Sequence, residues 1–198
     1  MRLQSAWGEL ELTLPVAAPF QGRNAALAVA ALELLAEQGW ALDAAAIARG
    51  FAQRVLPGRA EALPEGLLLD GAHNPQKAQA LLGALPPGRI VAVLGSTGHR
   101  PPRDVLEVLA PRLDHVVATA PQLYGKETLA AEALAEAARA LGLSAEAAPD
   151  TAAAVDLARA RQDGGTLLVT GSLYLVGEAR ALVYPTRDVV LARTCWPE

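Results

Sequence analysis

The sequence predicts an α/β fold, with a Rossmann-like, mostly parallel sheet that carries helices on both faces and follows a shorter strand-plus-helices segment. Beyond residue 58, short apolar runs alternate with helical segments, which is typical of a parallel sheet. These runs are unbroken, as expected for strands that helices cover on both sides. Hydrophobic residues make up 52% of the 198 residues, which is enough to fill a core.

The pattern of residues 1–57 predicts one strand and two helices. Residues 9–14 alternate polar and apolar side chains, which predicts a half-exposed strand. We expect a loop over 15–23 and then a helix from Asn24 to Gln38, with Asn24 as its N-cap. Asp43 is a good N-cap for a second helix that ends near residue 53.

The sequence Val-Leu-Pro-Gly at 55–58 interrupts the helical pattern, so we divide the chain into domains 1–57 and 58–198. In the second domain we expect strands at 67–69, 90–94, 115–119, 144–147 and 166–170. We expect helices at 74–85, 103–110, 127–141, 151–161 and 173–182. This alternation implies right-handed crossover connections and a largely parallel sheet.

Composition excludes several classes of function. The formal net charge is −4 and no basic run occurs, which disfavours nucleic acid and anionic membranes as partners. The single cysteine, Cys195, cannot form an internal disulfide, and no Cys/His cluster has zinc spacing, so we predict no metal ligands. No signal peptide or long apolar span is evident, and the cytoplasm is the expected location.

Polar residues and glycines follow the predicted strands. The segment DGAHNP occupies 70–75, and further such residues follow at 95–99, 119–121 and 171–172. Because ligands of open α/β sheets bind at the carboxyl ends of the strands, we expect a small-molecule site there. This expectation requires the side chains of Asp70, His73 and Ser172 to converge along one rim of the sheet.

Each candidate side chain has both a functional and a structural interpretation. An aspartate at a strand end, such as Asp70, is costly to bury unless it is paired. His73 precedes a helix start at Asn74, where the helix dipole favours a neutral imidazole that can bind a carboxylate or an amine. Both residues could instead serve only to cap and hold the loop.

Ser172 and Arg59 are open to the same two interpretations. Ser172 is either the N-cap of the last predicted helix or part of a site for a carboxylate or phosphate. Arg59 is either solvated or placed at the domain boundary to form two hydrogen bonds with an anion. No phosphate-binding loop, dinucleotide fingerprint or nucleophile elbow occurs in the sequence.

Four segments resemble the Mur ligase superfamily, and within it the folylpolyglutamate synthase/dihydrofolate synthase type. They are GRAE at 58–61, LLLDGAHNP at 67–75, LLVTGSLYLVG at 167–177 and FQGRNAALAVAALELL at 20–35. By this resemblance, 1–57 is a partial remnant of the central ATP-binding domain and 58–198 is the C-terminal Rossmann-like domain. Residues 98–104 and 122–126 depart from the family pattern.

The resemblance implies an ATP-dependent amide ligase that adds L-glutamate to a folate or dihydropteroate carboxylate through an acyl phosphate. It implies Asn24, Arg59 and Asp70 on the ATP side, and His73 and Ser172 at the glutamate, with Asp70 and His73 catalytic. ATP and Mg²⁺ are the implied cofactors. In the family, the phosphate loop and the magnesium ligands lie in an N-terminal region, so we expect this chain to be inactive alone.

Two alternatives remain open. One is a Mur-type ligase that adds another amino acid, and the other is a non-catalytic interaction module with the same fold. In either case, residues 1–57 are expected to expose apolar side chains. Such surfaces usually find partners, so we expect this segment to self-associate or to dock onto an N-terminal ATPase domain.

Overall fold

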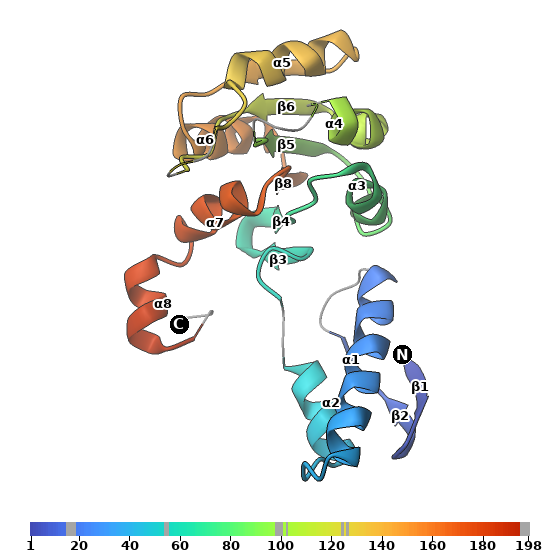
Figure 1. Ribbon diagram of the computed structural model, residues 1–198. Helices are drawn as coiled ribbons and strands as arrows, with labels where there is room; N and C mark the ends of the chain where they lie inside the picture. The colour runs from blue at the N-terminus through green and yellow to red at the C-terminus, as the bar shows by residue number, and fades with distance from the viewer. Residues whose placement is uncertain are drawn as a thin grey trace. The chain divides into compact units, whose positions relative to one another are not determined.

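The chain forms two compact units, Met1–Leu56 and Pro57–Glu198 (Figure 1). The computed structural model describes residues 1–14, 19–53, 56–97, 101, 103–123, 125 and 127–194. Expectations for Cys195, Lys126 and most of the loop at 98–102 therefore lie outside the described residues.

The first unit is a two-stranded hairpin packed against two helices. Strand β1 (Arg2–Ser5) pairs antiparallel with β2 (Gly8–Glu11), and helices α1 (Pro19–Glu37) and α2 (Ala44–Ala52) follow. The buried core of this unit consists of Leu10, Leu12, Val29 and Ile47. The strand predicted at 9–14 is confirmed as β2, although it ends at Glu11, and its partner β1 was not predicted.

Helix α1 begins five residues earlier than the sequence predicted. The expected loop is wrong over residues 19–23, because Pro19 suits a first helical turn and the apolar pattern continues from it. Asn24 consequently lies inside the helix and is not its N-cap; its amide donates to Gln21 Oε1 at 3.1 Å. Asp43 is confirmed as the N-cap of α2, since it accepts from the Ala46 amide at 2.7 Å.

The second unit contains a six-stranded sheet in the order β3-β4-β8-β5-β6-β7. Its strands are β3 (Glu61–Leu63), β4 (Leu67–Leu69), β5 (Ile90–Leu94), β6 (His115–Ala118), β7 (Ser144–Ala147) and β8 (Thr166–Thr170). All neighbouring pairs are parallel except β3–β4. The largely parallel sheet is confirmed, whereas β3 was not predicted, because its sequence Glu-Ala-Leu is not an unbroken apolar run.

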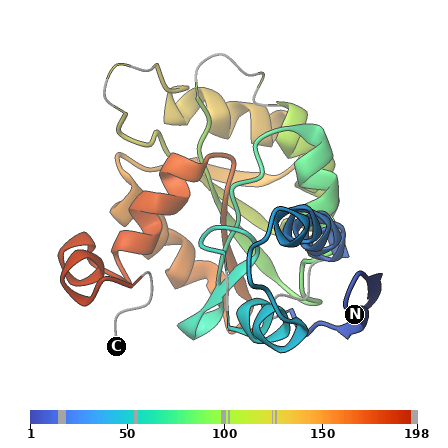
Figure 2. The ribbon, with the colours of Figure 1, turned by 60° about the horizontal axis from the view of Figure 1, so that its bottom comes forward.

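Helices cover both faces of this sheet, as predicted. Helices α3 (Pro75–Leu82), α4 (Arg103–Leu109) and α5 (Ala131–Ala140) pack on one face, and α6 (Thr151–Gln162) and α7 (Leu173–Ala181) on the other (Figures 1 and 2). Short 3-10 turns occupy Pro64–Gly66 and Ala110–Arg112. The last helix, α8 (Thr186–Ala192), was not predicted.

Helix α5 starts four residues later than predicted because the preceding residues extend toward the sheet. Thr128 forms an isolated antiparallel bridge with Thr97, and the Leu129 amide donates to the Ser96 carbonyl at 3.0 Å. These contacts commit the backbone at 128–129 to an extended form. Across the described part of the chain, no helix is long and apolar enough to cross a bilayer.

The order of the strands creates a switch point at one edge of the sheet, which is where the crevice of open α/β sheets lies. The chain leaves β4 through α3, builds β5, β6 and β7 outward, and returns through α6 to insert β8 between β4 and β5. Helix α3 follows β4 on one face, whereas α7 follows β8 on the other (Figure 1). Neighbouring strands whose helices leave to opposite faces form the switch point at which open α/β sheets bind ligands.

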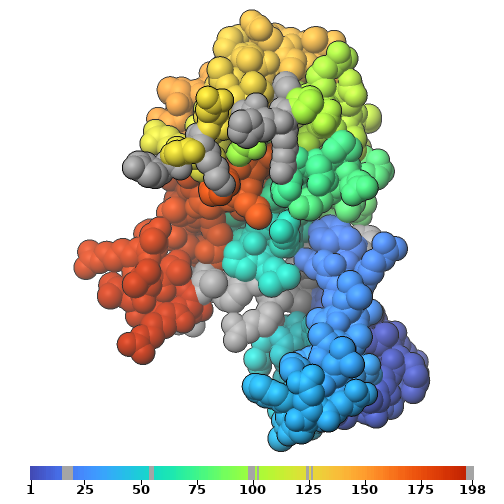
Figure 3. Space-filling model, in the orientation of Figure 1, coloured from blue at the N-terminus to red at the C-terminus, as the bar shows by residue number. Residues whose placement is uncertain are grey.

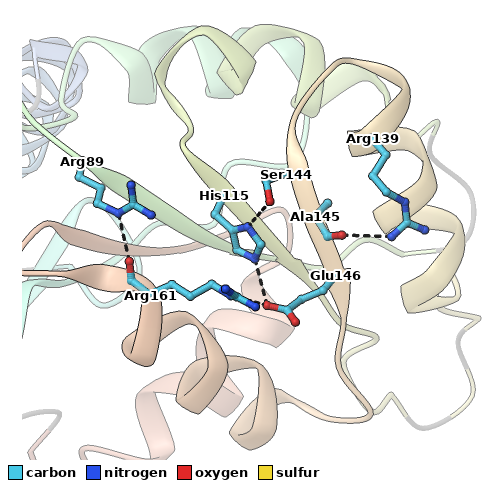
Figure 4. A network of polar contacts seen from close by, with 7 residues as sticks. All are labelled: Arg89, His115, Arg139, Ser144, Ala145, Glu146 and Arg161. Carbon is cyan, nitrogen blue, oxygen red and sulfur yellow. Dashed lines mark hydrogen bonds and ion pairs between the residues drawn. The ribbon is translucent and has the colours of Figure 1, made fainter.

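A polar network ties together β6, β7 and α6 where those strands begin (Figure 4). His115 is buried, with Nδ1 2.9 Å from Ser144 Oγ and Nε2 3.0 Å from Glu146 Oε1. Arg161 Nε donates to the same Glu146 oxygen at 2.6 Å. The hydrogen bond from Arg161, followed by that of His115, lowers the pKa of Glu146 below its usual value of 4.5.

We expect Glu146→Gln to be less stable than the parent chain at neutral pH and to match it in acid. A carboxyl whose pKa falls on folding stabilises the fold above its unfolded pKa, and this stabilisation is lost as pH falls through the folded pKa. Urea denaturation from pH 7 to pH 3 tests this difference. Glu136→Gln, on the exposed side of α5, is the matched control. A constant difference at every pH would contradict the prediction.

Candidate functional site

Backbone hydrogen bonds join the loops that follow β4, β8 and β5. The Asp70 amide donates to the Val169 carbonyl at 3.0 Å, and the Gly171 amide donates to the Ala72 carbonyl at 2.9 Å. The Gly95 amide donates to the Thr170 carbonyl at 3.3 Å. The strand ends that the sequence singled out therefore form one continuous edge.

Two glycines allow these loops to touch. A Cβ on Gly171 would lie 2.4 Å from the Gly95 carbonyl oxygen, and its φ of +96° is a conformation that side-chain-bearing residues rarely adopt. A Cβ on Gly71 would lie 2.2 Å from Leu173 Cδ2, at the start of α7. Figure 3 shows the turquoise surface around these loops beside the red surface of α7. A larger residue at Gly171 would push the loops apart, and one at Gly71 would displace the Leu173 side chain.

Asp70 holds two of the loops from inside. Its side chain is buried, with Oδ2 accepting from the Ala60 amide and Oδ1 from the Ala72 amide, both at 2.8 Å. Burial raises the pKa of Asp70 above 3.8, although the two amides and the charges of Arg59 and Lys77 partly oppose that shift. The sequence predicted that a buried Asp70 needs a partner, and two backbone amides provide it.

A second buried carboxylate secures the turn before β3. Glu61 accepts from the Gly58 amide at 2.9 Å, and it pairs with Arg180 of α7, whose Nε lies 3.0 Å from Oε1. The Arg180 guanidinium also stacks 4.7 Å above the ring of Tyr184. The Gly71 amide donates to the Gly58 carbonyl at 2.9 Å. Residues 58–61 are therefore held against both the β4 loop and α7.

This turn presents Arg59 under backbone strain. Ala60 is buried with φ of +50°, and Gly58 has φ of +66°. A left-handed alanine is uncommon and persists only where surrounding contacts enforce it, a condition often found at functional sites. Arg59 is half-buried, and its guanidinium makes no hydrogen bond or ion pair to the residues described in its surroundings.

His73 is half-buried in the β4 loop, and its hydrogen bonds indicate a tautomer. Nδ1 lies 2.8 Å from the Gly71 carbonyl oxygen, which can only accept, so Nδ1 carries the proton. Nε2 lies 3.1 Å from Lys77 Nζ, which can only donate. An imidazolium would point a second N–H, on Nε2, at the Lys77 ammonium, so the contact indicates a neutral ring with a lone pair on Nε2. Sequence reasoning missed Lys77, although its i+4 spacing from His73 was visible.

Ser172 and Asn74 have the capping geometry that the sequence allowed. Ser172 is buried at the start of α7, and its hydroxyl accepts from the Tyr174 amide at 3.2 Å. Asn74 accepts from the Lys77 amide at 2.9 Å at the start of α3. Both residues use their side chains to fix helices that begin at the crevice.

The structure thus brings Arg59, Asp70, His73 and Ser172 to one edge of the sheet, whereas Asn24 belongs to the first unit. Of the four, only Arg59 and His73 are more than slightly exposed, while Asp70 and Ser172 are engaged internally. Thr119, at the end of β6, is fully buried. The described residues include no group of three or more His, Cys, Asp or Glu side chains arranged to hold a metal ion.

A parallel sheet with a crevice at its switch point defines the second unit as a ligand-binding α/β domain of the Rossmann-like class. A family model described as "Mur ligase, glutamate ligase domain" matches residues 58–173, and the chain belongs to this family.

Related proteins extend this result. The chain is 31% identical over 194 residues to the Mycobacterium tuberculosis dihydrofolate synthase/folylpolyglutamate synthase, a match that covers 87% of this chain and 40% of the relative. The structure of the M. tuberculosis folylpolyglutamate synthase with ADP and AMPPCP is similar at 32% identity with a TM-score of 0.81, covering 91% of this chain and 44% of that one.

A cell-wall ligase from Corynebacterium efficiens, the UDP-N-acetylmuramoyl-L-alanyl-D-glutamate–2,6-diaminopimelate ligase, is 37% identical over 100 residues. This match covers 47% of the chain and 18% of that ligase. The chain thus spans less than half the length of each of these relatives.

We expect Asp70→Ala to lower the free energy of unfolding by about 3 kcal/mol, because it leaves two buried amides without an acceptor. Urea denaturation at pH 7 measures this loss. Asp156→Ala, at an exposed position on α6, should stay within about 0.5 kcal/mol of the parent chain. Equal stability of Asp70→Ala and the parent chain would contradict the anchoring role.

The raised pKa gives this anchor its own pH dependence. The folded chain binds the Asp70 proton more tightly than the unfolded chain, so the contribution of the acid to stability falls as pH rises from 3.8 through the raised pKa. This trend is opposite in sign to that of Glu146 and should be absent from Asp70→Asn.

Proposed function

We propose that this chain is the C-terminal part of an ATP-dependent ligase that joins L-glutamate to a folate or dihydropteroate carboxylate. Membership of the Mur ligase glutamate ligase family is the main support. The longer coverage by the folate-type relative favours this reaction over a cell-wall ligase, because the cell-wall match covers only 47% of the chain. The cytoplasmic location stays a prediction.

The proposed reaction has two steps. A carboxylate oxygen of the folate substrate attacks the γ-phosphorus of ATP, which forms an acyl phosphate and releases ADP. The amine nitrogen of glutamate then attacks the acyl carbon, phosphate leaves, and the amine loses a proton. Acyl phosphorylation supplies a good leaving group, so the protein acts mainly by positioning reactants and stabilising charge.

The four residues at this edge of the sheet have different proposed roles. Arg59 would bind a phosphate or carboxylate oxygen, since its guanidinium makes no hydrogen bond or ion pair to the described residues and the contacts of Glu61 hold its turn. His73 would contact the incoming amine through the Nε2 lone pair. Asp70 and Ser172 would act as positioning residues, because their side chains are buried and hydrogen-bonded to the backbone.

Asn24 and the ligands of Mg²⁺ are not among the residues at this edge of the sheet. Asn24, predicted on the ATP side, is exposed on α1 within the first unit. Mg²⁺ would neutralise phosphate charge when bound, but the residues described here offer no cluster for it. We therefore place its ligands, like the phosphate loop, in a further region of the kind that the longer relatives have room for, and expect no turnover by this chain alone.

Titration calorimetry tests the proposed ligands. L-Glutamate should bind weakly but more tightly than L-alanine or diaminopimelate, and ATP should also bind weakly. Arg59→Met should weaken ATP binding about 10-fold through loss of a charge-assisted hydrogen bond. Arg187→Met, at an exposed position on α8, should not. Preference for diaminopimelate would favour the cell-wall alternative, and absence of all binding would favour the interaction module. Turnover of dihydropteroate by the pure chain would overturn the proposed inactivity.

The first unit carries an apolar hollow that we propose as the contact for a further ATP-binding region. The hollow encloses about 520 Å³, and its lining includes Leu32, Ile47 and Phe51. Leu27 and Leu34, seven residues apart on α1, are 67% and 59% exposed, so they share one unpartnered helix face. Less than half of the relatives' length is present here, which leaves room for such a region.

Without that partner, the chain should self-associate as its concentration rises. Leu34→Glu should shift sedimentation velocity toward the monomer, because a charge on this face is costly to bury. Arg49→Glu, at an exposed position on α2, is the control and should not change the association. A monodisperse monomer at every concentration, with the first unit folded, would contradict this part of the proposal.

A further inference from the structure

Neither helix capping nor an ion pair among the described residues explains the position of the Lys77 side chain. Its ammonium lies 3.1 Å from His73 Nε2, a neutral acceptor. No carboxylate of the described chain lies within ion-pair distance of Lys77. Asp70, the carboxylate of the same loop, already accepts from two backbone amides. Lys77 thus has no ion-pair partner among the described residues, although its charge also acts on the buried Asp70 carboxylate.

The backbone of this pair is held firmly, whereas the lysine side chain is not. Asn74 accepts from the Lys77 amide at 2.9 Å, and Gly71 orients the His73 ring through its carbonyl. Lys77 itself is exposed, and its flexible four-carbon stem lets the ammonium leave the ring without moving α3. The two side chains form a fixed acceptor beside a movable cation.

An α-amino acid matches this arrangement. Its amine is a donor, as is the ammonium of Lys77, and can take the place of that ammonium on Nε2. Its α-carboxylate is attached to the same carbon as the amine, so it would lie close to the displaced lysine. The exchange gives the Lys77 ammonium an ion pair with the ligand carboxylate, and a donor stays on His73 Nε2.

We propose that Lys77 binds the α-carboxylate of the incoming amino acid while His73 Nε2 accepts a hydrogen bond from its amine. This inference rests on the proposed function and names the residue that recognises the main-chain end of glutamate. It assigns Lys77 a binding role that the capping geometry of α3 does not require. The pair would select α-amino acids over simple amines at this crevice.

The test compares L-glutamate with 4-aminobutyrate, which keeps the amine and the distal carboxylate but lacks the α-carboxylate. Calorimetry on the full chain should give a glutamate affinity about 10-fold lower for Lys77→Met, as expected for a lost charge-assisted hydrogen bond. Affinity for 4-aminobutyrate should be unchanged. Lys77→Arg should retain most of the glutamate affinity, and Gln76→Met, on the neighbouring exposed position, should retain all of it.

Nitrogen NMR of the imidazoles provides a readout that does not depend on turnover. The chain has three histidines, so a His73→Gln variant assigns the signals. We expect a protonated Nδ1 and an acceptor Nε2 for His73, with Nε2 shifting when glutamate is added and also in Lys77→Met without ligand. Equal glutamate affinity in Lys77→Met and the parent chain would overturn the inference and leave the proposed function standing. Failure of the parent chain to bind glutamate at all would overturn both.

Discussion

The site depends on one buried carboxylate. Asp70 lies at the end of β4, and its two oxygens accept from amides in two different loops, at Ala60 and Ala72. Burial without these bonds would be costly, and burial with them makes the carboxylate a rigid link. Through it, the turn that presents Arg59 and the loop that presents His73 have a fixed relation. The strained backbone of Ala60 persists because this link and the Glu61 contacts enforce it.

Some residues at this edge stabilise the loops, and others have side chains that could contact a ligand. Asp70, Glu61 and Ser172 are buried and use their side chains on the backbone or on Arg180. The side chains of Arg59, His73 and Lys77 are at least partly exposed at this edge of the sheet and offer two cations and one neutral acceptor. Such a set suits anionic and amino-acid substrates. The distribution fits the proposed reaction, in which ATP activates a carboxylate and this chain contributes only part of the site.

Much of the fold was predictable because it depends on local patterns. The unbroken apolar strands at 67–69, 90–94 and 166–170 are confirmed, since burial on both faces leaves a plain signal. Strands β1 and β3 were missed because they are short and depend on pairing with a neighbour. For the candidate site, the sequence predicted that Asp70, His73 and Ser172 share one edge of the sheet, and the structure places them there. The sequence did not distinguish residues that stabilise the loops from residues that could contact a ligand. That distinction depends on the burial of Asp70 and Ser172 and on the pairing of Lys77 with His73, which arise only in three dimensions.

Amide hydrogen exchange at Ala60 and Ala72 tests the anchoring by Asp70 most directly. The account predicts that both amides exchange only when the unit opens, as slowly as amides of the neighbouring strand β4, and that Asp70→Asn accelerates at least one of them by an order of magnitude or more. Exchange of both amides in the parent chain at the rate of an exposed loop would contradict a carboxylate that joins the two loops.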